Sequence, residues 1–223
     1  MRFGREKSMS NLIRKELRLA MHPAAVMFLA LSAMLMIPNY PYYVICFYTS
    51  LGIFFICLSG RENHDIFYSM TLPVSRRDIA GARMLTCVML EMIQLLLAIP
   101  FAYLRQKVMT EGNLVGMDAN IAFFGGALMV YGIFNLVFFA EYYKNPEKVG
   151  IVFVNGTIAE WIVIIAAEAL VHIIPFMRDV LDTPDSLHVP EKLCFLAAGA
   201  VVYAVLTFAA WRMSAERFGK VDL

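Results

Sequence analysis

The sequence predicts an all-α integral membrane protein with six membrane-spanning helices. Of the 223 residues, 60% are hydrophobic and only 17% are charged, whereas a soluble domain is about half apolar and about one quarter charged. The apolar residues also gather into stretches near the length of about 20 residues that a helix needs to cross a bilayer. Each stretch must be helical, because a backbone in lipid has to satisfy its own polar groups.

An amphipathic helix is expected before the first span, over residues 10–22. Apolar side chains recur there at helical spacing, and basic side chains occupy the other face. This pattern is typical of a helix that lies in the membrane interface with its cations near anionic headgroups. The alternative is a plain basic flank that only fixes topology. The residues assigned to the interfacial helix are Leu12, Ile13, Arg14, Lys15, Leu17 and Arg18.

The six expected spans form a single transmembrane domain over residues 1–223, since no linker is long enough to separate domains. A short break, Pro38-Asn39-Tyr40-Pro41, makes the first two spans a tight helical hairpin. Glycines at Gly125, Gly126, Gly132 and Gly199 are expected to let helices approach closely. The spans are placed at about 20–37, 41–60, 84–104, 121–141, 150–174 and 193–211.

The basic residues predict the orientation of these spans. With the N-terminus inside, the cytoplasmic segments carry 15 of the 19 Lys and Arg residues, and only Arg105, Lys107, Arg178 and Lys192 lie outside. The opposite orientation would reverse the usual excess of cations on the cytoplasmic side. Both termini are therefore expected in the cytoplasm. The long acidic loop 175–191 then lies outside, with its role left open.

The segment between the second and third spans is expected to form a short helix and then a sharp corner. A mixed apolar and aromatic stretch ends at Pro73, and Ser75 to Asp78 has the S-x-x-D form of a helix capping box. Such a short helix suits docking on a cytoplasmic partner; the alternative is that it rests on the bilayer surface. The expected docking residues are Asp65, Ile66, Phe67, Tyr68, Met70, Leu72, Pro73, Arg76 and Arg77.

Three acidic residues, Glu91, Glu160 and Glu168, fall within the third and fifth spans. An ionisable group at such depth costs about 3 kcal/mol on insertion scales, so it normally faces the bundle interior. Glu168 and His172 lie four residues apart and share a helix face. Three interpretations stay open: a proton relay, a metal site at Glu168 and His172, or neutral and hydrogen-bonded groups that line a pathway or stabilise helix contacts.

Several kinds of chemistry have no motif in this chain. It lacks the G-x-x-x-x-G-K-[ST] phosphate loop, G-x-S-x-G and H-E-x-x-H, and none of its four cysteines forms a C-x-x-C pair. A net charge of +1 gives no basic field for nucleic acid. The sequence therefore predicts neither an enzyme nor a bound metal or cofactor.

Three segments of the chain resemble a known family. They are Asn11-Leu12-Ile13-Arg14-Lys15-Glu16-Leu17, Leu72-Pro73-Val74-Ser75-Arg76-Arg77-Asp78-Ile79-Ala80-Gly81-Ala82-Arg83, and the tail from Glu216 to Leu223. Together with the span pattern they resemble permease subunits of ABC exporters of the second class (ABC-2 type). The similarity is greatest to the small six-span permeases of phenol-soluble modulin exporters of Gram-positive bacteria.

The resemblance implies a function and a set of partners. It implies a bacterial plasma-membrane permease that pairs with a second copy or a related permease and works with a separate cytoplasmic ATPase, which binds ATP and Mg. The loop from Asp65 to Leu72 would be the coupling helix, and the exported substrates would be amphipathic or hydrophobic, peptides among them. The alternatives are a proton-coupled secondary carrier that uses the intramembrane Glu residues, and a non-transporting membrane scaffold or immunity protein.

Overall fold

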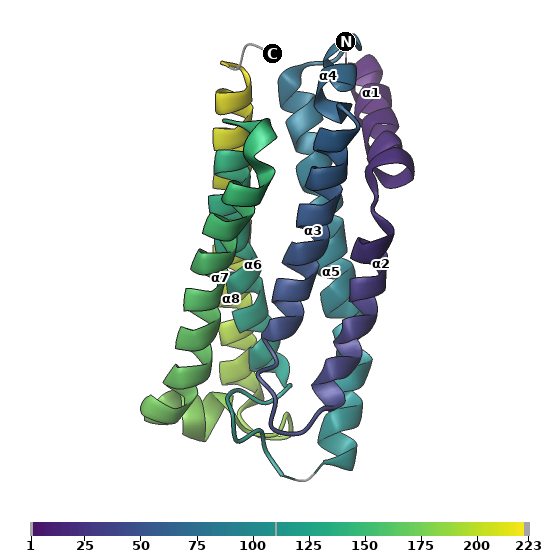
Figure 1. The fold of residues 1–223 in the computed structure, drawn as a ribbon. Helices are drawn as coiled ribbons and strands as arrows, with labels where there is room; N and C mark the ends of the chain where they lie inside the picture. The colour runs from purple at the N-terminus through teal and green to yellow at the C-terminus, as the bar shows by residue number, and fades with distance from the viewer. Residues whose placement is uncertain (1, 110, 221–223) are drawn as a thin grey trace.

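The computed structural model describes residues 2–109 and 111–220, the first seven of these (2–8) as backbone only. The part of the chain that it describes is helical, without strands (Figure 1). The last three residues of the family-like tail, 221–223, lie outside this part. Five described helices are long and apolar enough to cross a membrane. They are α3 (Val44–Glu62), α5 (Arg76–Val108), α6 (Ile121–Tyr142), α7 (Val149–Ile173) and α8 (Val189–Phe218).

The first span differs from the expected continuous helix over 20–37. α1 (Arg2–Lys15) continues into a π-helical turn, η1 (Glu16–Ala20), and the chain then bends by 91° into α2 (Pro23–Leu29) and the 3₁₀ segment η2 (Ala30–Met36). Only if this bent pair counts as one span does the number reach the predicted six.

Proline causes the bend, because Pro23 cannot continue the preceding helix and instead occupies the first turn of α2. The imidazole Nδ1 of His22 caps this new helix by accepting a hydrogen bond from the Ala24 amide at 3.1 Å. With rises of about 1.5 Å per α residue and about 2.0 Å per 3₁₀ residue, α2 and η2 extend about 25 Å, slightly less than a bilayer core.

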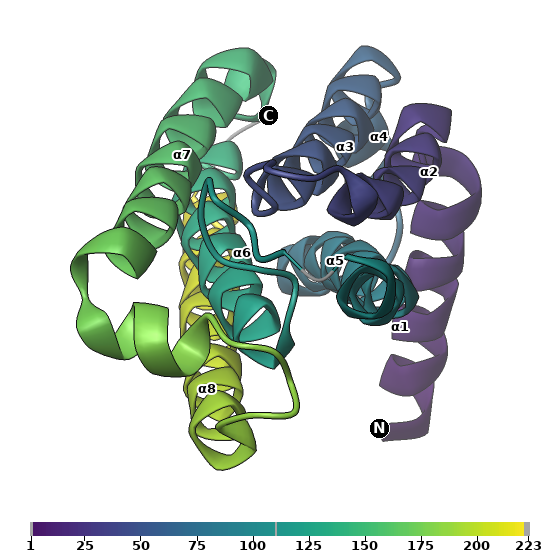
Figure 2. The ribbon, with the colours of Figure 1, turned by 90° about the horizontal axis from the view of Figure 1, so that it is seen from below.

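The helices form two halves that meet along one surface, which we call the seam. α2, η2, α3 and α5 pack together as the first half, and α6 packs most extensively on α8 and then on α7 to form the second half (Figures 1 and 2). Across the seam, α3 faces α7 and α5 faces α8.

Glycines allow the tightest contact within the second half. A methyl group added at Gly199 of α8 would lie 2.2 Å from the Gly125 carbonyl oxygen of α6, and one added at Gly125 would lie 2.9 Å from the Phe195 carbonyl oxygen. The sequence-based expectation that these two glycines set a helix contact is confirmed, because only a hydrogen side chain fits between the two backbones.

The two ends of the bundle differ in construction. α1, the short helix α4 (Asp65–Met70) and the last turns of α8 lie together at what we call the termini end (Figure 1). The opposite end, the loop end, holds the long connection that precedes α6 and the one that follows α7. The second connection includes the π-helical turn η4 (Met177–Leu181). The orientation rule makes the termini end cytoplasmic, which stays a prediction.

Acidic side chains fasten the loops of the loop end to one another. The Arg105 side chain donates to Asp118 at 2.7 Å, and the Asp118 amide donates to the Asp182 carboxylate at 2.6 Å. Gln106 donates to the Asp185 carboxylate at 2.8 Å, and Asp185 in turn accepts from the first amide of α6 at 2.9 Å. Within this structure, the acidic loop therefore closes the bundle at this end.

The close approach of α6 and α8 predicts the effect of Gly199→Ala. The new methyl group would meet backbone atoms that cannot move aside, so we expect a loss of about 1–3 kcal/mol in the free energy of unfolding. Gly150→Ala is the matched control, since nothing lies within 4 Å of its added methyl group. Denaturant titration in detergent micelles measures both. Equal stability of the two variants would contradict the assigned contact.

The half-buried position of Asp182 predicts a pH dependence of stability. Burial, opposed by the Asp118 amide hydrogen bond, raises the pKa of Asp182 from 3.8 to about 6. The folded chain therefore binds this proton more tightly than the unfolded chain. The contribution of Asp182 to stability is greatest below pH 3.8 and is lost as the pH rises through about 6.

Asp182→Asn tests this prediction, because the amide oxygen keeps the acceptor and removes the titration. We expect the melting temperature of Asp182→Asn, relative to the parent chain, to rise as the pH increases from about 4 to about 7. A difference that stays constant with pH would contradict the assignment.

Candidate functional site

The helix α4 presents two aromatic side chains at the termini end. It follows His64, which has a left-handed backbone conformation with φ of 52°, and it ends before Pro73. Phe67 and Tyr68 point outward with 60% and 57% of their surface exposed, whereas Ile66 and Ser69 on the opposite face are buried. Positions three apart share a helix face. The expected short helix is therefore present, with a buried side and an aromatic exposed side.

A group of charged residues, which we call the charge clamp, fixes the position of α4. The ammonium group of Lys15 donates to Asp65 at 2.7 Å and to the Ser69 hydroxyl at 2.8 Å, and it lies 2.9 Å from Glu16. The guanidinium group of Arg83 pairs with both Glu16 and Asp65. The clamp thus joins the end of α1, α4 and the third turn of α5, with two cations and two anions.

The charge clamp constrains position more than it adds net stability. The side chains of Glu16 and Arg83 are almost completely buried, and the desolvation of such a pair offsets much of its attraction. Removal of one partner is costly, however, because the other charge stays buried and uncompensated. Gly60 of α3 makes room for the arginine, since an added methyl group would lie 3.1 Å from its Nη1 atom.

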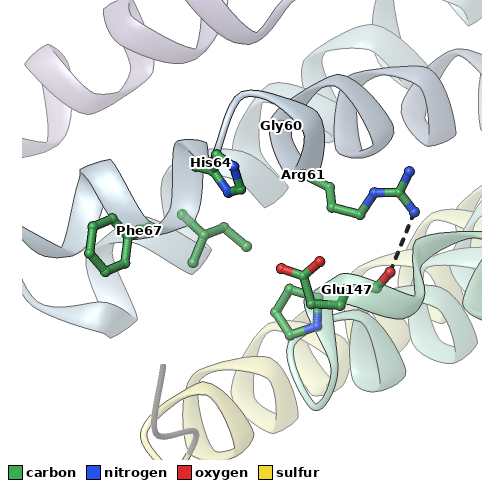
Figure 3. Close-up of a pocket in the computed structure, with 7 residues that line it drawn as sticks. Gly60, Arg61, His64, Phe67 and Glu147 are labelled. Carbon is green, nitrogen blue, oxygen red and sulfur yellow. Dashed lines mark hydrogen bonds between the residues drawn. The ribbon is translucent and has the colours of Figure 1, made fainter.

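A cavity of about 450 Å³ lies beside α4, and we call it the termini-end cavity. It separates α3 and α4 from the turn η3 (Pro146–Lys148), which precedes α7 (Figure 3). One polar contact crosses it, a hydrogen bond of 3.4 Å from Arg61 to the Glu147 carbonyl oxygen (Figure 3). The cavity therefore marks the termini end of the seam. Its lining residues are Gly60, Arg61, His64, Ile66, Phe67, Pro146 and Glu147.

The remaining predicted docking residues lie around the start of α5. Arg76 donates to the Phe218 carbonyl oxygen at 3.0 Å, and the guanidinium of Arg77 stacks over the Trp211 ring at 4.4 Å. These two arginines thus attach the start of α5 to the end of α8. The Ser75 hydroxyl accepts from the Asp78 amide at 3.1 Å, which confirms the predicted helix cap. Of the other predicted residues, Met70 and Leu72 are half-buried and Pro73 is exposed.

The helix predicted to lie in the membrane interface corresponds to the end of α1 and η1, and it has one face against the bundle. Leu12 is buried and Ile13 is half-buried, whereas Arg14, Leu17 and Arg18 are exposed. Lys15 was expected among the headgroup-facing cations, but its side chain points to the charge clamp. Sequence reasoning missed the clamp because Glu16 and Arg83 look like ordinary interfacial charges until the fold brings them together.

The intramembrane acids occupy two levels of the bundle. Glu91 accepts from the Tyr203 hydroxyl at 2.6 Å and from Asn135 at 3.1 Å, and Glu160 accepts from the Ser50 hydroxyl at 2.8 Å. Both acids are fully buried near the middle of their helices. They connect elements on opposite sides of the seam.

Glu168 and His172 instead hold a loop at the loop end. The Glu168 carboxylate accepts from the Met117 amide at 3.0 Å and from the Tyr43 amide at 3.5 Å. A ring nitrogen of His172 lies 3.0 Å from the Val115 carbonyl oxygen. Within residues 2–109 and 111–220, no group of three or more His, Cys, Asp or Glu side chains is arranged to hold a metal ion.

These features define a class of protein: a multi-pass helical membrane protein that presents an anchored aromatic helix at one end. Comparison with known families is more specific. A family model described as ABC-2 family transporter protein matches residues 11–218, and this chain therefore belongs to the ABC-2 transporter family. Its members are membrane components of ABC transporters without an ATP-binding domain of their own. No curated protein and no solved structure matches the chain.

The charge clamp predicts the effect of Arg83→Ala on stability. This change removes one of the two cations that Glu16 and Asp65 share and leaves the buried Glu16 with Lys15 alone. We therefore expect a loss of about 3–5 kcal/mol in the free energy of unfolding. Arg212→Ala is the control, because its pair with Glu216 is largely exposed and such pairs contribute about 0–1 kcal/mol. Thermal unfolding in detergent micelles compares the two. Equal melting temperatures of the two variants would contradict the assigned ion pairs of Arg83 with Glu16 and Asp65.

Proposed function

We propose that this chain is the permease subunit of an ATP-driven exporter and that α4 is the coupling helix on which a separate ATPase subunit docks. ATP and Mg would be bound by that partner. One observation carries the docking assignment: Phe67 and Tyr68 are exposed on a helix whose opposite face is held by the charge clamp. Exposed aromatic side chains on a rigid support are typical anchors of protein interfaces.

The proposal places both termini in the cytoplasm of a bacterial cell, with the protein in the plasma membrane. The excess of Lys and Arg at the termini end supports this orientation. It brings α4, the termini-end cavity and the exposed cations of the interfacial helix to the side where ATP is available and where anionic lipid headgroups are abundant.

The charge clamp explains how movement of a docked ATPase would reach the membrane. Because Asp65 pairs with Lys15 and with Arg83, displacement of α4 must also displace the interfacial helix and α5. α5 is helical over 33 residues, which corresponds to about 50 Å. It extends to Arg105, which binds Asp118 in the closed loop end. We infer that α5 transmits ATPase movement from one membrane face to the other.

The resemblance supports the remaining parts of the proposal. The exported substrates would be amphipathic or hydrophobic molecules, peptides among them, and two permease copies, identical or related, would act together. The large apolar surface of α7 and α8, much of it exposed in the single chain, is available for lipid or for such a second copy.

A second candidate function is a proton-coupled secondary carrier, and the buried positions of Glu91 and Glu160 favour it. It predicts transport by the purified chain under a pH gradient without ATP, lost in Glu160→Gln. Transport that requires the ATPase and persists without a pH gradient would exclude it.

The docking proposal predicts the effect of the double change Phe67→Ala and Tyr68→Ala. Loss of both anchors should weaken ATPase binding by at least about tenfold, measured by co-purification from cells that express both subunits. Substrate-stimulated ATP hydrolysis should fall with it.

Phe208→Ala with Tyr103→Ala is the matched control, because these aromatic side chains are 60% and 64% exposed on α8 and α5, away from α4. It should keep ATPase binding and hydrolysis. If the α4 variant kept both as well, α4 would not be the docking helix.

A further inference from the structure

The middle of the seam contains an unusual polar site. Glu91 of α5 is hydrogen-bonded to Asn135 of α6 and Tyr203 of α8, and Glu160 of α7 is hydrogen-bonded to Ser50 of α3. Each acid therefore lies on one half and binds the other. The two carboxyl groups are also near enough to interact electrostatically.

When its two acids are ionised, this site has more hydrogen-bond acceptors than donors. Three buried oxygen atoms on the seam, Glu91 Oε1, Glu160 Oε2 and Asn135 Oδ1, have no hydrogen-bond partner within the protein. An ionised carboxylate and an amide oxygen can only accept. Buried polar groups are rarely left in this condition, and each such atom calls for an explanation.

No cation of the described chain compensates these acids. The buried cations are used elsewhere: Arg83 in the charge clamp, and Arg105 and Lys192 with aspartates of the loop end. An isolated carboxylate in a dry membrane interior is too costly to persist, so a proton neutralises each acid while the seam is closed. The side chains that face the two acids are neutral: Cys46, Ser50, Tyr131, Asn135 and Tyr203.

The seam has a cavity at its termini end. The termini-end cavity lies between the two halves, and the hydrogen bond from Arg61 to the Glu147 carbonyl oxygen crosses it. The loop end is instead closed by the ion pair of Arg105 and Asp118 and by Glu168. Separation of the halves from the termini end would admit water, and hydrated carboxyl groups ionise at neutral pH.

We propose that Glu91 and Glu160 form a binding site for positively charged groups, and that the cargo it selects is an amphipathic molecule that carries an ammonium or guanidinium group. Such a group supplies the donors that the three unpartnered oxygen atoms lack, and it forms charge-assisted hydrogen bonds with the two carboxylates. An anionic amphiphile would be repelled. That the bound molecule is a transported cargo rests on the proposed exporter function, whereas the binding site itself does not.

The test measures binding to the purified chain in nanodiscs of phosphatidylcholine. The probe is radiolabelled dodecylamine, which is cationic at neutral pH, and dodecanol is the uncharged probe with the same alkyl chain. We expect saturable dodecylamine binding above that of empty nanodiscs, at least about tenfold tighter than dodecanol binding. The double change Glu91→Gln and Glu160→Gln should abolish this preference.

Glu141→Gln is the matched control, because it removes an acid of α6 that binds Asn155 rather than the seam. It should bind dodecylamine as the parent chain does. Equal binding of the two probes by the parent chain would overturn the proposal, and so would unchanged binding in a folded double variant. If the double variant does not fold, the comparison of the two probes on the parent chain decides.

The outcomes also separate this site from the exporter function. Charge-selective binding by a chain that recruits no ATPase would overturn the proposed function and support the site. Recruitment of an ATPase through α4 without charge-selective binding would support the proposed function and overturn the binding site.

Discussion

An arginine buried at the edge of a membrane bundle must find its counter-charges inside the protein, and Arg83 finds two of them on different elements. Glu16 comes from the turn before the first bend, and Asp65 comes from the first turn of α4. Lys15 completes the set by pairing with the same two acids. Because none of these charges can be left unpaired at low cost, α1, α4 and α5 must adopt one relative arrangement.

The rest of the bundle is held together in three different ways from end to end. Ion pairs fix the termini end, hydrogen bonds from hydroxyl groups to carboxyl groups join the halves in the middle, and carboxylates that bind backbone amides close the loop end. In the middle, Glu91, Glu160 and Asn135 each have an unpartnered oxygen atom on the seam, and at the termini end a cavity lies between the halves. In the proposed exporter, the cavity would lie on the cytoplasmic side and the closed loop end on the outside.

Local sequence patterns predicted much of the candidate site, and failed where distant segments meet. The capping box at Ser75 and the short helix before Pro73 were predictable, because both depend on residues within one turn of each other. The π-helical turn η1 in the first span was not, since it packs against α3 and α5, which lie far along the chain. The inward orientation of Lys15 was also beyond prediction, because its partner Asp65 lies 50 residues away.

By itself, the sequence determined that the chain is a helical membrane protein without motifs for ATP binding, and which of its loops carries exposed aromatic residues. Those conclusions follow from hydropathy, charge and short-range spacing, which every span expresses independently of its neighbours. Only the tertiary structure decided how the acids are used. Glu168 closes a loop and Glu16 pairs with Arg83, whereas Glu91 and Glu160 each accept a hydrogen bond from the opposite half of the bundle. The reason is that the cost of a buried charge is set by its partners, and the fold chooses those partners from distant parts of the chain.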